Sequence, residues 1–338
     1  MIAASLTTQI SQSPSAGTAR VIWRRTVAAD LAARHAGLVR RSMLTAAGIT
    51  TGEIRGELRA GRWVQVGPNT IAVPRPTVPG WQRASAKHDG QRLGEAMPTG
   101  LAPFWWAVWE SGTAAALDGA SSLVAQGMTG FTLTRIDVSV PQGSRVWRHP
   151  GITVTRRRDV GRVLPVLPRV EPATATIRAA QLATSDRQAA LLICLPVQQR
   201  IVAPAHLLDR WRTVRRSPRH TLLGQVIADV CDGAHSLGEL DFAGLCRRTD
   251  LPEPRRQQLR RGPRGRIYLD NEFACGLVVE IDGAQHGWGL APVEDALRAN
   301  ALTLQSRRVL RIPVIGLRLN PQAFMAQVAE GIRLMTLR

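Results

Sequence analysis

The spacing of apolar residues predicts two short helices and a hairpin in the first quarter of the chain. Leu44, Ile49 and Ile54 are spaced so that all three can face one core. Gly48 falls where a tight turn between two helices needs a permissive backbone. Two short β runs follow within residues 62–73, around a Gly-Pro-Asn turn.

The second helix carries candidate nucleic-acid contacts. Thr50 and Glu53 have the spacing of a capping box, and Gly61 is placed to end the helix. Helix, turn, helix and hairpin is the order of a winged helix-turn-helix, whose second helix can enter a major groove. We take four residues as candidate contacts: Thr51, Arg55, Arg59 and Arg62. The alternative is a protein–protein module, which Glu53 and Glu57 favour because they dilute the charge of the helix. Trp63 is expected to fill the core beneath the hairpin.

The middle of the chain combines strands with helices. Alternation over residues 135–140 and 152–156 predicts two strands, and we expect two or three helices within 174–230. Trp105 and Trp109 lie one helical turn apart on a predicted helix. We therefore expect both indole rings to lie in a core.

Two β-forming runs near the C-terminus carry carboxylates. Residues 266–270 and 277–283 predict strands joined by a turn. Residues two apart on a strand share a face, so Glu280 and Asp282 point the same way, and Asp270 lies on the neighbouring strand. Glu280 stands in an apolar run, where an unpaired carboxylate is costly. We therefore expect a divalent cation, with Mg²⁺ the ion best suited to activating water for phosphodiester attack.

Two further side chains are candidates for the same site. His286 follows the second run and can transfer a proton or hold a water, although a lone histidine is more often structural. Ser236 and Glu239 have the spacing of a capping box at the start of a predicted helix. Glu239 is a candidate third metal ligand, with capping alone as the alternative.

Arginine clusters form a second group of candidates. Residues 255–266 hold arginines and no acidic residue, which predicts a phosphate-facing segment, with a charged loop as the alternative. The candidate contacts here are Arg255, Arg256, Arg260, Arg261 and Arg264. Arg156, Arg157 and Arg158, at the end of a predicted strand, are either a further phosphate-binding face or a solvated strand end.

The charge of the chain indicates a polyanionic partner. Its 338 residues have a formal net charge of +19, and Lys87 is the only lysine. The guanidinium group matches phosphate oxygens bidentately. A bias towards arginine codons would explain arginine over lysine, but not the excess over acidic residues. Nucleic acid is the expected partner.

Cysteine spacing and hydropathy indicate the cellular compartment in which the protein is expected. The four cysteines form no CxxC pair, which disfavours a zinc site and fits buried thiols in a reducing cytoplasm. No uncharged apolar stretch is long enough to span a membrane. The first 19 residues carry no charge and are rich in Ser, Thr and Gln, which predicts a disordered leader rather than a signal peptide.

Residues 35–74 begin with His-Ala-Gly-Leu-Val-Arg-Arg-Ser-Met-Leu and end with Gly-Arg-Trp-Val-Gln-Val-Gly-Pro-Asn-Thr-Ile-Ala-Val-Pro. This segment resembles the N-terminal winged helix of AbiEi-type antitoxins. The runs 137–141 and 151–158 resemble the rest of that family more loosely. The family belongs to type IV toxin–antitoxin systems and includes transcriptional autoregulators. The resemblance implies DNA binding and a cognate toxin partner.

The block from Gly233 onward resembles the PD-(D/E)XK nuclease superfamily, in its branch similar to very-short-patch mismatch repair endonucleases. The motifs that carry it include Tyr268-Leu-Asp270, Val279-Glu-Ile-Asp-Gly283, His286, Asp295-x-x-Arg298 and Val309-Leu-Arg311. The resemblance implies a restriction-endonuclease-like α/β sandwich with a Mg²⁺-dependent site. Asp270 and Glu280 become metal ligands, and Asp282 stands where the superfamily often has lysine. Asp282 cannot stabilise a developing phosphorane as an ammonium would.

Together these patterns predict a multidomain chain of mixed α+β and α/β class. Its expected segments are a leader (1–20), a winged helix-turn-helix (21–75), a linker (76–102), a middle α/β domain (103–232) and a nuclease-like domain (233–338). The expected function is a cytoplasmic DNA-binding protein with a Mg²⁺-dependent endonuclease-like domain and no membrane association. The alternative is a catalytically silent antitoxin-like transcriptional regulator with a toxin, repair or defence partner.

Overall fold

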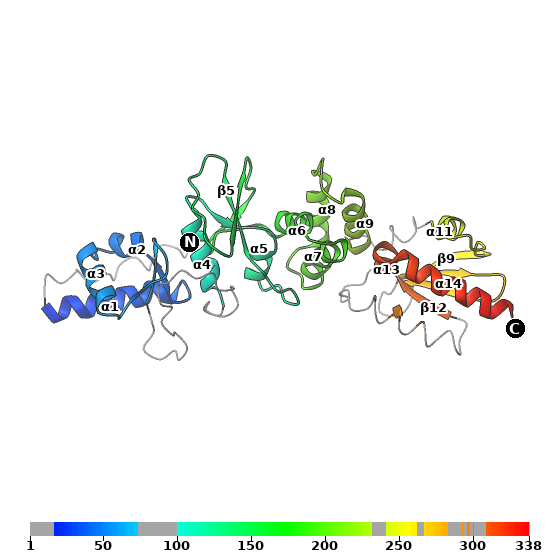
Figure 1. Ribbon diagram of the computed structural model, residues 1–338, viewed down its shortest axis with the longest axis horizontal. Coiled ribbons are helices and arrows are strands. Elements are labelled where there is room, and N and C mark those ends of the chain that lie inside the picture. The colour runs from blue at the N-terminus through cyan, green and yellow to red at the C-terminus, as the bar shows by residue number, and fades with distance from the viewer. Residues whose placement is uncertain are drawn as a thin grey trace. The chain divides into compact units, whose positions relative to one another are not determined.

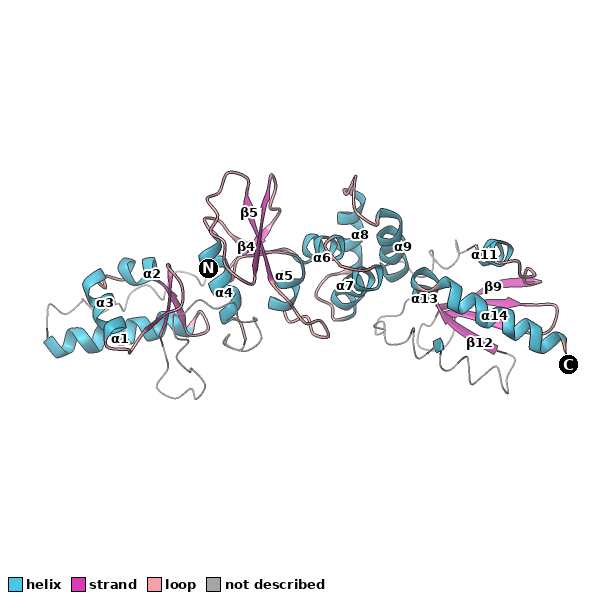
Figure 2. Cartoon of the chain, in the orientation of Figure 1, coloured by secondary structure: helices cyan, strands magenta, loops and turns pink. Residues whose placement is uncertain are grey.

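The computed structural model describes residues 17–73, 100–231, 241–261, 267–282, 293, 296–297, 300 and 309–337, and for 256, 259–261 and 267–269 the backbone alone (Figure 1). The protein has a mixed α+β fold with several sheets, as predicted (Figure 2). It divides into two compact units, Met1–Leu117 with Leu133–Arg169, and Asp118–Thr132 with Val170–Arg338. Within the described part, no helix has the length and apolar character that a bilayer crossing requires.

The first unit begins with three helices and a small sheet. Its elements are α1 (Gly17–Ala33), β1 (Leu38–Arg40), α2 (Arg41–Ala46), α3 (Thr51–Arg59), β2 (Val64–Gln65) and β3 (Thr70–Ala72), and the antiparallel sheet has the order β1-β3-β2. Leu44, Ile49 and Ile54 are buried in one core, as predicted, and Trp63 joins them at 3% exposure. The expected leader over 1–20 is wrong at its end, because α1 already begins at Gly17.

A helix and a five-stranded sheet complete this unit. They are α4 (Ala102–Ser111), β4 (Ala116–Leu117), β5 (Ile136–Pro141), β6 (Ile152–Arg157), β7 (Val163–Leu164) and β8 (Arg169–Val170), in the sheet order β6-β5-β4-β8-β7. The strands predicted over 135–140 and 152–156 are confirmed, and they pair in parallel. Trp105 and Trp109 are buried with ring centroids 5.2 Å apart, which confirms their core position.

The second unit starts with five helices: α5 (Gly119–Ala125), α6 (Pro172–Gln181), α7 (Asp186–Gln198), α8 (Pro204–Arg212) and α9 (His220–Cys231). Four of them lie between residues 172 and 231, where two or three were expected. The number was underestimated because the connections between these helices are short and do not stand out in the sequence. A buried ion pair joins Arg178 of α6 to Asp118, with Nη1 and Oδ2 2.9 Å apart.

A four-stranded sheet forms the last part of this unit. The elements are α11 (Phe242–Arg248), β9 (Arg256–Arg261), β10 (Ile267–Glu272), β11 (Val278–Asp282), β12 (Val309–Pro313), α13 (Val314–Leu319) and α14 (Pro321–Thr336). The sheet order is β12-β11-β10-β9, with β11 and β12 parallel and the other pairs antiparallel. Strand β9 and helix α13 were not predicted. Helix α11 begins at Phe242 with Asp241 as its N-cap, later than the predicted start at Ser236, which lies outside the described residues.

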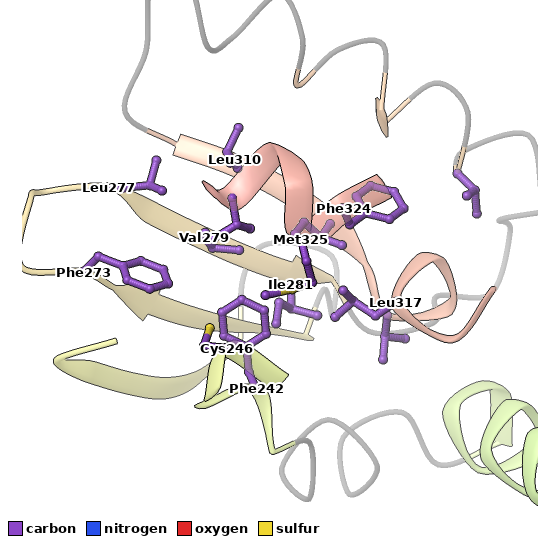
Figure 3. Packing of buried hydrophobic residues seen from close by; sticks show 14 residues of the cluster. Phe242, Cys246, Phe273, Leu277, Val279, Ile281, Leu310, Leu317, Phe324 and Met325 are labelled. Carbon is purple, nitrogen blue, oxygen red and sulfur yellow. The ribbon is translucent and has the colours of Figure 1, made fainter. Parts of the chain in front are cut away.

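One face of this sheet packs into an apolar core. Val279 and Ile281 of β11 point into it, and Phe324 and Met325 of α14 and Phe242 of α11 close it (Figure 3). Because side chains alternate along a strand, Glu280, which lies between Val279 and Ile281, belongs to the opposite face. Side chains of β10 and β11 that do not enter this core lie on the other face of the sheet, where a functional site could form.

Candidate functional site

Helix α3 carries acidic residues on the side that faces α1. Thr50 caps α3, and its side chain and backbone form the predicted capping box with Glu53. The Arg20 Nε donates to Glu53 Oε1 at 2.8 Å, so the capping carboxylate also binds α1. Capping and tertiary packing therefore fix the start of α3 together.

Glu57 is the centre of this contact. Its side chain has no exposed surface. Arg24 of α1 donates to Oε1 at 2.6 Å, Arg62 donates to Oε2 at 2.5 Å, and Arg25 lies within 3.4 Å of both oxygens. Burial raises the pKa of Glu57, but the hydrogen bonds from Arg62 and Arg24 outweigh it and hold that pKa below its ordinary value. The carboxylate is thus kept ionised inside the unit.

Glu53 is held ionised by the same mechanism. The hydrogen bond from Arg20 lowers the pKa of Glu53 from 4.5 to about 2; burial opposes this fall, and the hydrogen bonds from Thr50 add to it. Both acids of α3 are therefore neutralised by guanidinium groups. They do not dilute the positive charge on the exposed side of the helix.

That exposed side carries three of the four predicted contacts. Thr51, Arg55 and Arg59 are all exposed, and their spacing of four residues places them on one face of the helix. In the described structure, neither Arg55 nor Arg59 forms an ion pair. Arg62 differs, because its guanidinium binds Glu57, although its side chain remains 44% exposed.

The hairpin after α3 is held by α4. Glu110 of α4 has no exposed surface; it accepts hydrogen bonds from the Asn69 backbone N–H at 2.9 Å and from the Thr70 hydroxyl at 2.5 Å. The Trp106 indole N–H also donates to the Val66 carbonyl at 3.0 Å. The tip of the hairpin is thereby fixed within the unit.

The C-terminal sheet places two predicted carboxylates opposite each other. Asp270 of β10 pairs in register with Glu280 of β11. Directly opposed residues share a face, and their Cβ atoms lie roughly 5 Å apart. Asp282 shares this face and is 5% exposed. The prediction that the two strands bring their acids to one side is confirmed by this register.

A polar row crosses the whole sheet at this level. Gln258 of β9 is opposite Asp270, and Arg311 of β12 is opposite Glu280. The Arg311 Nε donates to Glu280 Oε2 at 3.0 Å. Glu280 was expected inside a buried apolar run, but its side chain is 19% exposed and lies on the face opposite Val279. The apolar neighbours in its sequence belong to the core, and Glu280 does not.

The remaining predicted site residues belong to the C-terminal half of the chain. Glu239, His286 and Arg264 lie outside the described residues. Of the arginine cluster, Arg255 is exposed, and the strand β9 contains Arg256, Arg260 and Arg261. The alternative that this segment is a charged loop is therefore wrong over 256–261, because its backbone pairs with β10.

The described residues meet part of the requirement for Mg²⁺. Among them, no group of three His, Cys, Asp or Glu side chains is placed to hold a metal ion. Asp270 and Glu280 nevertheless offer two opposed carboxylates. Mg²⁺ commonly takes one or two carboxylates and completes its shell with waters and phosphate oxygens. The two carboxylates are therefore the kind of oxygen ligand that Mg²⁺ takes.

Sequence reasoning missed the residues that surround these sites. The partners of the α3 acids, Arg20, Arg24 and Arg25, are about thirty positions away in the chain, and no local pattern pointed to them. Arg311 and Gln258 could have been found. Each lies on an alternating strand position that shares a face with the carboxylates.

Sequence comparison with protein families and with curated proteins finds no match. The likenesses to AbiEi-type antitoxins and to PD-(D/E)XK nucleases stay predictions from sequence motifs. The geometry of α3 and of the C-terminal sheet is therefore the structural basis for a proposed function.

Proposed function

We propose that this protein binds duplex DNA through helix α3 and carries a Mg²⁺-dependent phosphodiesterase site of endonuclease type on its C-terminal sheet. One observation carries the binding proposal: both acids of α3 pair with arginines of α1, whereas Arg55 and Arg59 are exposed. A helix of this kind presents positive charge alone to a partner. Phosphate oxygens and guanine edges are the ligands that such arginines bind best.

The arrangement around α3 supports a winged helix-turn-helix as the binding module. Gly48, with φ of 87°, forms the turn between α2 and α3, and the hairpin of β2 and β3 follows α3. In such modules the second helix enters the major groove. The formal charge of +19 adds a sequence-independent attraction to the phosphate backbone.

The hydrolytic part of the proposal is supported by the opposed Asp270 and Glu280. These two carboxylates would hold Mg²⁺, while Arg311 orients Glu280 through its hydrogen bond. The ion, when bound, supplies charge stabilisation at a scissile phosphate. Asp282 and the predicted His286 and Glu239 complete the candidate set for this proposal.

Binding is tested with the double variant Arg55→Gln/Arg59→Gln. Fluorescence anisotropy with a labelled duplex should show affinity lower by about tenfold or more. The slope of log affinity against log salt should fall by about 0.9 for each phosphate that an arginine no longer neutralises. The matched control is Arg212→Gln, which changes an exposed arginine of α8 and should bind as the wild type does. Unchanged affinity in the double variant would refute the role of α3.

Hydrolysis is tested by plasmid nicking in Mg²⁺ and in EDTA. Glu280→Gln and Asp270→Asn should each abolish metal-dependent nicking. Glu272→Gln, which alters an exposed carboxylate two positions further along β10, should leave the nicking rate unchanged. Nicking that survives in both carboxylate variants would refute the assignment of the site.

A second candidate is a catalytically silent, antitoxin-like regulator of transcription. The ion pair between Arg311 and Glu280 favours it, because a guanidinium already compensates the carboxylate without a metal. This function predicts tight binding upstream of the protein's own gene, unaffected by EDTA, and no nicking under any condition. A cognate toxin is the partner that belongs to this candidate.

A further inference from the structure

A second cationic surface in the first unit surrounds an exposed tryptophan. The connection from β5 to β6 holds Trp147, whose exposure of 40% is high for so large an apolar side chain. Residues 143–158 include five arginines and no acidic residue. Arg145, Arg148 and Arg156 are among the exposed ones. We call Trp147 with these three arginines the Trp147 platform.

The backbone of the platform is fixed to the rest of the unit. Val146 forms a β-bridge with Gly112, which follows α4. Gly112 has φ of 138°, and a Cβ on it would collide with the Arg145 carbonyl oxygen, so only glycine allows this approach. Further along the connection, the rings of His149 and Trp106 meet with centroids 5.4 Å apart. The segment that carries the exposed indole is therefore held in place by contacts with α4 and with the residue that follows it.

Two arginines of the platform have contacts within the connection that carries the indole. The Arg145 guanidinium lies over the Trp147 ring, 5.6 Å from its centroid. The Arg156 Nε donates to the Ser144 carbonyl at 3.3 Å, which holds this arginine of β6 against the same connection. The partly exposed indole is thus accompanied by two cations that can bind phosphates.

We propose that the Trp147 platform binds single-stranded nucleic acid by stacking an unpaired base on the indole. Bases of an intact duplex are stacked on each other and cannot reach an exposed ring, whereas an unpaired base can. The surrounding arginines would bind the flanking phosphates. This site is separate from α3, since it uses a different ligand chemistry and different residues of the unit.

The test compares Trp147→Leu with Trp147→Phe in the full chain. With a labelled thymidine oligomer of about 20 nucleotides, the Leu variant should bind about tenfold more weakly, because loss of one stacked base has that effect. The Phe variant keeps an aromatic face and should stay within about threefold of the wild type. Binding should also quench the tryptophan fluorescence of the wild type more than that of either variant. A uridine oligomer of equal length distinguishes DNA from RNA as the source of the strand.

Three controls make the result specific. Affinity for a duplex of equal length should be the same in all three proteins. The double variant Arg55→Gln/Arg59→Gln should retain its affinity for the single strand, so failure of the α3 proposal and failure of this one are distinguishable. The inference is overturned if the wild type binds neither oligomer, if Trp147→Leu binds as tightly as the wild type, or if the Leu and Phe variants lose equal affinity.

Discussion

Glu57 shows how one residue determines which side of α3 is available. Its carboxylate has no exposed surface and accepts hydrogen bonds from Arg24, Arg25 and Arg62. Had it faced solvent, α3 would present a negative charge beside Arg55 and Arg59. Because it faces α1, the guanidinium groups that neutralise it are not the ones proposed to bind DNA, with the exception of Arg62.

Replacing Glu57 by Gln should destabilise the region around α3 by about 2–3 kcal/mol, because several guanidinium groups lose a charged acceptor. Hydrogen exchange of the α3 amides, followed by mass spectrometry, measures the change. Glu330→Gln is the control, since its pair with Arg333 is exposed to solvent and should contribute little to stability. Equal exchange in Glu57→Gln and the wild type would show that the arginines do not depend on this carboxylate.

The low pKa of Glu53 predicts a pH dependence for the same helix. Its pKa is 4.5 unpaired and about 2 in the folded protein, mainly because of the Arg20 hydrogen bond. A depressed folded-state pKa gives stability that is complete above pH 4.5 and is lost as the pH falls towards 2. The stability difference between wild type and Glu53→Gln should therefore shrink across this range. Hydrogen exchange of α3 at stepwise pH tests it, with α14 as the internal reference; a constant difference would contradict the assignment.

At the scale of elements, the hairpin of β2 and β3 depends on α4. Glu110→Gln replaces a double acceptor by an amide whose N–H₂ would face the donors of Asn69 and Thr70. The expected loss is about 1–3 kcal/mol, the cost of unsatisfied buried groups. Gly67→Ala should have a similar effect, because a Cβ there would lie 2.5 Å from Glu110 Oε1. Faster amide exchange over residues 64–72 is the measurement, and protection equal to the wild type in both variants would contradict it.

Local patterns predicted the elements whose signals lie close together in the chain. The Thr50–Glu53 capping box, the Gly48 turn and the core positions of Trp63, Trp105 and Trp109 are all confirmed. Each depends on a spacing of a few residues or on one strongly apolar side chain. Strand alternation and the turn between the two runs also placed Asp270 on the strand next to Glu280, whereas the register that sets the two opposite each other is seen only in the structure.

Elements that depend on distant partners were missed. Strand β9 has the sequence Arg-Gln-Gln-Leu-Arg-Arg, which is almost entirely polar and does not show the apolar alternation of a strand. Its extended conformation depends instead on backbone pairing with β10. Helix α1 begins at Gly17, four residues before the predicted start of the winged helix-turn-helix segment at residue 21. Its contacts with α3 through Arg20 and Arg24 could not be read from either segment alone.

At the scale of the whole molecule, the proposed binding and hydrolysis belong to different compact units. Helix α3 lies in the first unit, whereas Asp270 and Glu280 lie in the second. Each site is built from contacts within its own unit. The two proposed activities should therefore be separable by substitution.

Kinetics on a long duplex provide the test of this separation. Glu280→Gln should abolish nicking but bind duplex as tightly as the wild type or slightly more tightly, because it removes a negative charge near DNA. Arg55→Gln/Arg59→Gln should raise KM by about tenfold and leave kcat unchanged, since it removes binding that is equal in the ground state and the transition state. If the arginine variant instead lowered kcat at saturating DNA, α3 would take part in the chemical step, and the two units would have to act as one site.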